Sequence, residues 1–452
     1  FGGWAIDLHP VDGVFSPLPG CTQWHSKGVY QIPWRCMYSR NISNLMLAGR
    51  IISATHVAFA STRVMATCAH GAQAVGMAAA ICLRDGISPR SLLEEGKMRE
   101  LQQRLLRSGQ YIPSLVASLP GDLAKDAQIS ATSELALSSL SDCGETLLLN
   151  ESWAMMLPVS EGAMPAVEVT LDVSEATTLH AELRISGNPE NHTPDQTLEV
   201  LEIPLKPGTN QKIRLAFQQE IDCTRYAFVC LIANTSISAH LSDQRVSGVI
   251  SLCQACNKAV AKSAVQSPPP GIGVDTFEFW TPKRRPLGKN LAIQIEPPLR
   301  AFAASNLVNG ISRPTRATNA WVADFAHEQP VVRLHWDTPQ TIDSIELDFD
   351  TDFDHPMESV LMGHPERDMP FCVREVRISA EDEKTEAGSG HTAIASRAAT
   401  RLLAEIADNH QTRCVVKLDA PVTTSALEIQ ILTPSLHVPA ALFAVRCFGP
   451  VS

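Results

Sequence analysis

The stretch that decides the fold runs from Leu45 to Ala80 and reads LMLAGRIISATHVAFASTRVMATCAHGAQAVGMAAA. This order predicts a short apolar strand over 45–48, a polar loop, and a helix rich in small residues over roughly 62–84. The first amide N–H groups of a helix lack partners within it, and the helix dipole is positive at that end. A loop leading into a helix N-terminus therefore suits anionic or electron-rich ligand atoms.

One face of the predicted helix carries only small residues. Ala72, Gly76 and Ala80 are spaced four apart, so they share a face. A face without bulky side chains lets a backbone or a flat ligand approach closely. The same pattern is typical of an alanine-rich core helix, and periodicity alone leaves both interpretations open.

The composition is that of a globular protein. A length of 452 residues favours about two to four domains. The net charge of −11 argues against nucleic acid as a partner. No run of about 18 apolar residues occurs, so no membrane span is expected. The sequence does not fix the compartment, and a cytoplasmic location is the default expectation.

Several stretches resemble bacterial, polysaccharide-associated FAD-dependent oxidoreductases. They read FGGWAIDLHP (1–10), YQIPWRCMYSRNISNL (30–45), AGR (48–50), STRVMAT (61–67) and LQQRLLRSGQYIP (101–113). The resemblance extends to Ala131. It implies FAD as cofactor, with the loop after the first strand and the following helix meeting the flavin's ribityl chain, pyrophosphate and ring edge. The residues assigned to the cofactor are Gly49, Arg50, Ser53, Thr55, Arg63, Gly71, Gln73 and Gly76.

The nucleotide-binding turn of such proteins is missing. Flavoproteins of this type bind the ADP half of FAD at a Gly-x-Gly-x-x-Gly turn between a strand and a helix. The chain contains no such turn, and Gly271-Ile-Gly273 continues a proline-rich linker. The chain also opens at Phe1 in mid-motif. We therefore expect a C-terminal portion of a flavoprotein that binds FAD weakly by itself, with its N-terminal half as a possible partner.

Two histidines are candidates for catalysis. Hydride transfer from a sugar alcohol to flavin needs a group that accepts the hydroxyl proton, and an imidazole titrates near working pH. The resemblance places His9 and His56 near the flavin ring, although a hydrogen-bonded loop histidine is the plainer interpretation. Arg35 is assigned to substrate, because guanidinium groups bind carboxylates in pairs of hydrogen bonds. An ordinary salt bridge is the alternative for Arg35, Arg50 and Arg63, and many related flavoproteins carry an acidic residue where Arg50 stands.

Alternating apolar and polar residues dominate after residue 130 and predict β-sandwiches. The segments with this pattern are 167–173, 179–185, 198–205, 331–336, 342–347, 373–378, 426–431 and 444–448. The predicted fold class is thus an α/β remnant of an FAD-binding domain plus a helical pair, followed by two β-sandwich, jelly-roll-like domains. The second loosely resembles discoidin or galactose-binding jelly rolls. The expected domains are 1–87, 88–129, 130–266 and 288–452, with a linker over 267–287.

Two further motifs leave alternatives open. Asp348, Asp350, Asp352 and Asp354 alternate, and they form either the solvated end of a strand or, with His355 and His364, a loop that reaches a substrate cleft or holds a metal ion. Cys253-Gln-Ala-Cys256 is a lone pair without further zinc ligands nearby in sequence, so buried thiols or a local disulfide are favoured. No metal site is assigned.

The sequence thus predicts part of an oxidoreductase that transfers hydride from a carbohydrate-type alcohol or amine to flavin. Its substrate is expected to be a small molecule or a carbohydrate such as a uronic-acid derivative. The alternative is a carbohydrate-binding or scaffold protein in which the flavin-like segment has no function.

Overall fold

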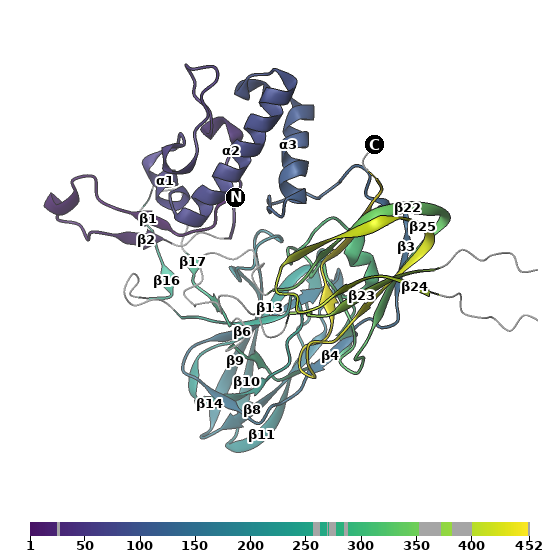
Figure 1. Cartoon of the computed structure of the whole chain (residues 1–452). Helices are drawn as coiled ribbons and strands as arrows, with labels where there is room; N and C mark the ends of the chain where they lie inside the picture. The colour runs from purple at the N-terminus through teal and green to yellow at the C-terminus, as the bar shows by residue number, and fades with distance from the viewer. Residues whose placement is uncertain are drawn as a thin grey trace, which may run out of the picture.

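The structure is a computed structural model that describes residues 1–24, 28–255, 263–268, 270, 277–283, 288–351, 372–381 and 400–450. Figure 1 shows a helical N-terminal part above two β-rich parts. The predicted fold class is confirmed: a small α/β part and a helical pair precede two β-sandwiches. We call the two β-rich parts the first sandwich and the C-terminal sandwich.

The N-terminal part combines a small hairpin with three α-helices. The hairpin pairs β1 (Ile6–Leu8) with β2 (Thr22–Trp24). The helices are α1 (His56–Thr62), α2 (Met65–Asp85) and α3 (Glu95–Arg107). The 3-10 turns of this part are η1 (Gly13–Phe15), η2 (Trp34–Cys36), η3 (Gly49–Ile51), η4 (Pro89–Leu93) and η5 (Leu123–Asp126).

Helix α2 packs its inner face against α3 and η4. Ala78 and Ile81 of α2 contribute to a buried cluster with Leu101 and Leu105 of α3. The leucines of α3 recur at helical spacing, as predicted, which gives that helix one apolar face. Helix α2 ends at Asp85 because Gly86 adopts a left-handed conformation with φ of 65°.

The predicted helix over roughly 62–84 is α2, which begins three residues later, at Met65. A separate short helix, α1, precedes it and was not predicted; Val64 is extended with ψ of 149°, and Arg63 caps α1 by bonding to the carbonyl of Phe59. The loop after Gly49 therefore leads into the short helix α1 rather than into α2. The predicted strand over 45–48 is also absent. Only Met46 pairs, in a single bridge to Tyr38, and a lone segment without neighbouring strands cannot form a ladder.

The first sandwich consists of two large sheets. One orders its strands as β10 (Gln196–Leu205), β9 (Thr177–Ile185), β13 (Arg225–Leu231), β6 (Trp153–Val159), β15 (Ile250–Cys253) and β18 (Thr281–Pro282). The other orders β19 (Asn290–Leu291), β14 (Asn234–Ser242), β8 (Ala166–Val173), β20 (Ile293–Leu299) and β4 (Leu137–Leu140), with β11 (Gly208–Leu215) on β8 and β5 (Thr146–Leu149) on β14. Two-stranded ribbons pair β7 (Gly162–Ala163) with β12 (Glu220–Ile221) and β16 (Val265–Gln266) with β17 (Phe277–Glu278).

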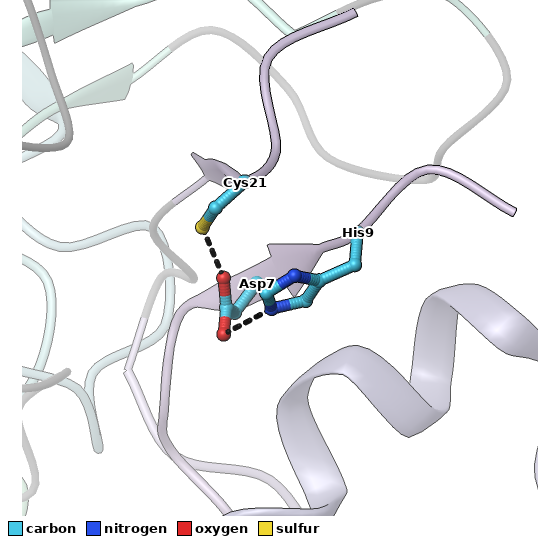
Figure 2. Close-up of side chains that lie close together, drawn as sticks. All are labelled: Asp7, His9 and Cys21. Atoms are coloured by element: carbon cyan, nitrogen blue, oxygen red, sulfur yellow. Dashed lines mark hydrogen bonds and ion pairs between the residues drawn. The ribbon is translucent and has the colours of Figure 1, made fainter. Parts of the chain in front are cut away.

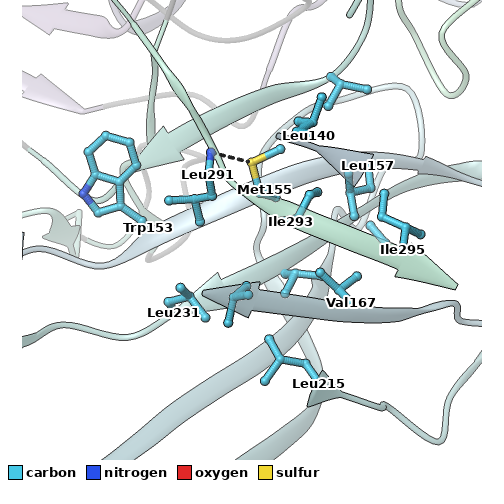
Figure 3. Packing of buried hydrophobic residues seen from close by; sticks show 14 of the residues in the cluster. Leu140, Trp153, Met155, Leu157, Val167, Leu215, Leu231, Leu291, Ile293 and Ile295 are labelled. Carbon is cyan, nitrogen blue, oxygen red and sulfur yellow. Dashed lines mark hydrogen bonds between the residues drawn. The ribbon is translucent and has the colours of Figure 1, made fainter. Parts of the chain in front are cut away.

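Apolar residues from both sheets fill the space between them (Figure 3). Strand β8 alternates buried and half-buried positions, so Val167 and its i+2 neighbours face the core. Strand β6 is buried along its whole length because one face packs in this core and the other, with Ala154 and Met156, in a second buried cluster. Leu157 of β6 is fully buried within this core.

The C-terminal sandwich is organised around two long strands. Its main sheet orders β24 (Thr400–Ile406), β23 (Val376–Glu381), β25 (Arg413–Ile431), β22 (Val331–Asp348) and β27 (Ala444–Phe448), with β3 (Gln128–Ala131) on β22. The first half of β22 pairs with β3, and its last residues pair with β27. Irregular register in the middle of β22 separates the two halves, which the sequence showed as two predicted strands.

A short ribbon joins the two cores. It pairs β21 (Trp321–Val322) with β26 (Ala441–Leu442). Trp321 and Leu442 belong to the core of the C-terminal sandwich, whereas Val322 and Ala441 belong to the core of the first. Successive residues of a strand point to opposite sides, so one ribbon serves both sandwiches.

The strand pairing differs from the expected domain division in three places. Strand β18, over 281–282 within the expected linker, pairs with β15 of the first sandwich. Strands β19 and β20, over 290–299, join the first sandwich, and β3, over 128–131, joins the C-terminal one. The alternating pattern shows that a segment is a strand but not which sheet it enters, because that choice depends on distant partners.

Helix α3 also contacts the C-terminal sandwich. Leu106, at the end of the helix, forms a cluster with Ala117, Leu119 and Phe448 of β27. The turn η6 (Ala304–Val308) leads to Gly310, whose φ of 81° and close approach to Ala117 exclude a side chain. The end of the helical part is therefore fixed on the C-terminal sandwich.

Helix α2 has an exposed outer face. By length and composition alone it could cross a membrane, and 22% of its apolar window is buried. A single such helix is weak support for a membrane span, since core helices of soluble proteins share these properties. Met65 and Leu83, near its two ends, are 89% and 86% exposed.

Candidate functional site

The strongest cluster of reactive side chains lies on the β1–β2 hairpin (Figure 2). Nε2 of His9 lies 3.3 Å from Oδ2 of Asp7, and the Cys21 thiol donates to Oδ1 of Asp7 at 2.5 Å. Arg63, at the end of α1, donates from Nη2 to the same Asp7 carboxylate at 2.8 Å and to the backbone carbonyl of Asp7 at 3.2 Å. Asp7 thus holds an imidazole, a thiol and a guanidinium together.

The surroundings of Asp7 keep it ionised. Burial by itself raises the pKa of Asp7, but hydrogen bonds from Cys21 and His9 and the nearby charge of Arg63 lower it overall. Burial and the bond to this carboxylate raise the pKa of the Cys21 thiol to about 11. Cys21 is therefore a thiol at neutral pH and not a thiolate nucleophile.

The cluster suits proton transfer better than metal binding. The donor atoms of Asp7, His9 and Cys21 lie within 4.8 Å of one another, which is close enough for a shared cation. However, Arg63 already neutralises the carboxylate, and a zinc ion requires Cys21 as a thiolate. An ionised carboxylate beside an imidazole stabilises the protonated ring, as in the base-and-orienter pairs of hydrolases. The His9 side chain is 52% exposed, so a substrate can reach it.

The loop assigned to the cofactor is exposed. Gly49 has φ of 70°, and a methyl group there would meet nothing within 4 Å. Arg50 and Ser53 are exposed in and after η3. The hydroxyl of Thr55 accepts from the amide of Ala58 at 3.3 Å and thereby caps α1. This glycine-initiated, accessible loop fits the close approach of a ribityl chain or phosphate, with Arg50 as the available cation.

The residues of α2 that are assigned to the cofactor differ in how accessible they are to a ligand. Gly76 is exposed with open space around it, whereas Gly71 lies near Met37. The amide of Gln73 is already engaged: Nε2 donates to Ser108 Oγ at 3.0 Å, and Oε1 accepts from Gln110 at 2.7 Å. A flavin contact by Gln73 would require these bonds to open.

The remaining assigned residues lie on exposed segments of the N-terminal part. His56 is the exposed first residue of α1, and Arg35 is exposed in η2. Their roles in catalysis and substrate binding stay predictions. Arg63 is not a free surface cation, because it is paired with Asp7.

The sequence interpretation missed the partners of His9. Asp7 lies on β1 and His9 directly follows that strand, and the spacing of two residues was the available signal. Cys21 and Arg63 join them only through the hairpin and the end of α1. Arg413 and Arg446, the partners of Asp348 described below, were also missed.

The alternating aspartates separate in the structure. Asp348, at the end of β22, is 2% exposed and accepts hydrogen bonds from Arg413, Arg446 and Ser312. Asp350 accepts from Ser247 at 2.5 Å. The prediction of a solvated strand end is thus wrong at Asp348, because two guanidinium groups replace water. Asp352, Asp354, His355 and His364 lie outside the described residues, as does Cys256 of the cysteine pair.

Comparison with known proteins supports the resemblance in the N-terminal part. A family model described as FAD dependent oxidoreductase matches residues 1–105, within the stretch where the resemblance was found. No curated protein matches the chain in sequence.

Among solved structures, the chain is similar to sugar-binding modules. The family 32 carbohydrate-binding module from Streptococcus pneumoniae EndoD is 13% identical, covers 32% of this chain and 84% of its own, and has a TM-score of 0.23. The chitosan-binding module 1 of a chitosanase/glucanase from Paenibacillus sp. IK-5 is 9% identical, with coverages of 33% and 86% and a TM-score of 0.22. The family 32 module of C. perfringens NanJ, in complex with galactose, is 12% identical, with coverages of 32% and 85% and a TM-score of 0.22. Because these identities and TM-scores are low, we draw no conclusion about function from this similarity.

Proposed function

We propose that this chain forms part of an FAD-dependent oxidoreductase that takes hydride from an alcohol or amine carbon of a carbohydrate-type substrate. The observation that carries the proposal is the Asp7–His9 pair inside residues 1–105, the region that matches the oxidoreductase family. An exposed imidazole beside a half-buried, ionised carboxylate is an arrangement that suits alcohol oxidation.

His9 acts as the base in this proposal. In the tautomer in which Nε2–H donates a hydrogen bond to Asp7, the lone pair of the imidazole lies on Nδ1. Nδ1 then accepts the proton of the substrate hydroxyl. The Asp7 carboxylate then stabilises the imidazolium, and Arg63 fixes the position of Asp7. The chemistry that bound FAD supplies is acceptance of the hydride. Gly49, Arg50, Ser53 and Thr55 are the residues of this chain that would hold the cofactor.

The nucleotide half of the cofactor site comes from another polypeptide segment in this proposal. The outer face of α2 supports this, because it exposes the large apolar side chains of Met65 and Leu83 together with its stripe of small residues. Exposed apolar side chains on a helix favour burial against a further element. The chain lacks a Gly-x-Gly-x-x-Gly turn, so the covering segment is expected to carry one.

The test compares the purified chain with the chain co-expressed with the polypeptide encoded directly upstream. We expect co-purification with oxidised flavin, and substrate-driven loss of flavin absorbance that His9→Ala slows by about 10²-fold or more. His180→Ala is the matched control, since His180 is 48% exposed and also pairs with a carboxylate, that of Glu202. Equal reduction rates in the His9 and His180 variants would contradict the role of His9.

A carbohydrate-binding or scaffold protein is the second candidate. The observation that favours it is the engagement of Thr55 and Gln73 in bonds within the chain, which leaves fewer groups for a flavin. Tight retention of the chain on an immobilised glycan, unchanged by FAD or by the upstream polypeptide, would favour this candidate over the oxidoreductase.

A further inference from the structure

A pocket lies where the segment after α3 meets the C-terminal sandwich. Its volume is about 350 Å³, within the range of small-molecule sites. One wall comes from residues 106–117. The opposite wall comes from residues 310–313 and from the facing ends of β22, β25 and β27. We call it the junction pocket.

The charged lining of the junction pocket is mainly cationic. Arg313, Arg413 and Arg446 line it together with a single acid, Asp348. Asp348 is shared: Arg413 binds it side-on, from Nε at 2.6 Å and Nη2 at 2.8 Å, and Arg446 binds it from Nη1 at 2.8 Å. The lining thus contains three arginines and one acid, while the carboxylates of Glu346 and Asp122 lie outside it and interact with Arg413 and Arg446.

The arginines of the pocket are held in place. The side chain of Arg446 is 5% exposed, and its Nη2 donates to Ser312 Oγ at 2.7 Å. Arg413 also donates to the backbone carbonyl of Arg107. Arg313 lies over the ring of Tyr111, with 4.4 Å between its guanidinium carbon and the ring centre. Fixed donors lose little conformational entropy when a ligand binds.

The hydrogen bonds among described residues leave donors unused on both shared arginines. A guanidinium has five N–H groups, of which Arg413 uses three and Arg446 uses two. Guanidinium groups of this kind bind carboxylates and phosphates by paired hydrogen bonds. A buried positive charge is costly without a partner, so an anion that enters this pocket gains more than it would at the surface.

We propose that the junction pocket binds the carboxylate of an acidic sugar, a uronate. The unused N–H groups of Arg413 and Arg446 match the two oxygens of a carboxylate. The rest of the lining suits a sugar: Ser108, Gln110 and Thr412 offer hydroxyl and amide groups, and Leu106 and Ile311 offer apolar surface.

The pocket is connected to α2 through two polar side chains that line it. Ser108 accepts from Gln73, and Gln110 donates both to Gln73 and to the carbonyl of His70 at 2.9 Å. A uronate bound here would lie beside the helix assigned to the flavin. That the bound uronate is also the substrate rests on the proposed function, whereas the binding of a uronate in the junction pocket does not.

The test is direct binding of glucuronate to the full chain without flavin, measured by calorimetry. Glucose and inorganic phosphate are the comparison ligands. We expect glucuronate to bind at least about 10-fold more tightly than either, because glucose lacks the charge and phosphate lacks the sugar contacts. Arg313→Gln should weaken glucuronate binding about 10-fold or more, with an unchanged melting temperature as the check of folding.

Arg316→Gln is the matched control. It removes the same charge three positions away, from an exposed residue that bonds to the carbonyl of Thr224 and does not line the pocket. Its glucuronate affinity should stay within about twofold of the original chain. Equal losses in both variants, no glucuronate binding, or equal binding of phosphate or glucose would each overturn the proposal. None of these results bears on flavin binding, so failure here is distinguishable from failure of the proposed function.

Discussion

Replacement of Asp348 by Asn should destabilise the C-terminal sandwich strongly. The Asp348 side chain is 2% exposed and accepts hydrogen bonds from Arg413, Arg446 and Ser312. Asn keeps the shape but removes the charge that the buried Arg446 and the half-buried Arg413 share. Removal of one partner from a buried ion pair costs about 3–5 kcal/mol. The lower end of that range corresponds to a fall in melting temperature of about 6–12 °C for a unit of this size.

The pH dependence of this effect is fixed by the ionisation of Asp348. Burial alone would raise its pKa, but the hydrogen bond from Arg413 and the charges of Arg446 and Arg413 hold the pKa below its usual value. A carboxyl whose pKa is lower in the folded state stabilises the protein above its unfolded pKa of about 4 and loses this effect as the pH falls. The stability difference between the original chain and Asp348→Asn should therefore be full at pH 7 and shrink in acid.

The assay is thermal and urea unfolding of both proteins at several pH values. Asp408→Asn is the control, because Asp408 is 78% exposed and pairs with Arg374 at the surface, where solvent screens such pairs and they contribute little to stability. If Asp348→Asn costs no more stability than Asp408→Asn at pH 7, the shared-carboxylate network does not hold the two arginines as described.

Two further predictions concern stability. Gly310→Ala should lower the free energy of unfolding in urea by about 1–3 kcal/mol, because φ is 81° there and a methyl group would clash with the backbone of Ala117. Gly96→Ala is the control, because Gly96 lies on α3 with open space around it, and this change should be neutral or stabilising. An equal effect of both changes would contradict the close contact. His240 is 8% exposed on its side chain and lies between two aspartates; burial lowers its pKa, but hydrogen bonds and charges from both raise it overall. The stability that protonated His240 contributes is full below its unfolded pKa of about 6.5 and is lost as the pH rises through the higher folded pKa. His240→Gln should therefore lower the melting temperature more at pH 6 than at pH 9. A loss of melting temperature that does not depend on pH would contradict this.

The fold was predictable where the sequence pattern is local. Alternation identified β8 and β9, the leucine spacing identified α3, and Gly86 marked the end of α2. Sheet membership was not predictable in this way, since the pairing of β20 with β8 joins residues more than a hundred positions apart. The short helix α1 was also missed, because its seven residues are too few to show a helical period.

The candidate site was predictable only in part. His9 was identified from its chemistry and the resemblance, but its orientation depends on Asp7, and the position of Asp7 depends on Arg63 from a different element. The junction pocket could not be found from sequence. Asp348 and Arg446 are about a hundred residues apart, and their pairing follows from the register of β22 with β27.

We propose that residues 1–105 form one side of a flavin site that another segment completes. The most direct measurement is the flavin content of the chain after co-expression with the upstream polypeptide, compared with the chain alone in excess FAD. We expect near-stoichiometric flavin in the complex and little in the single chain. A complex that forms but contains no flavin, or one in which Arg50→Ala leaves flavin affinity unchanged, would contradict this proposal.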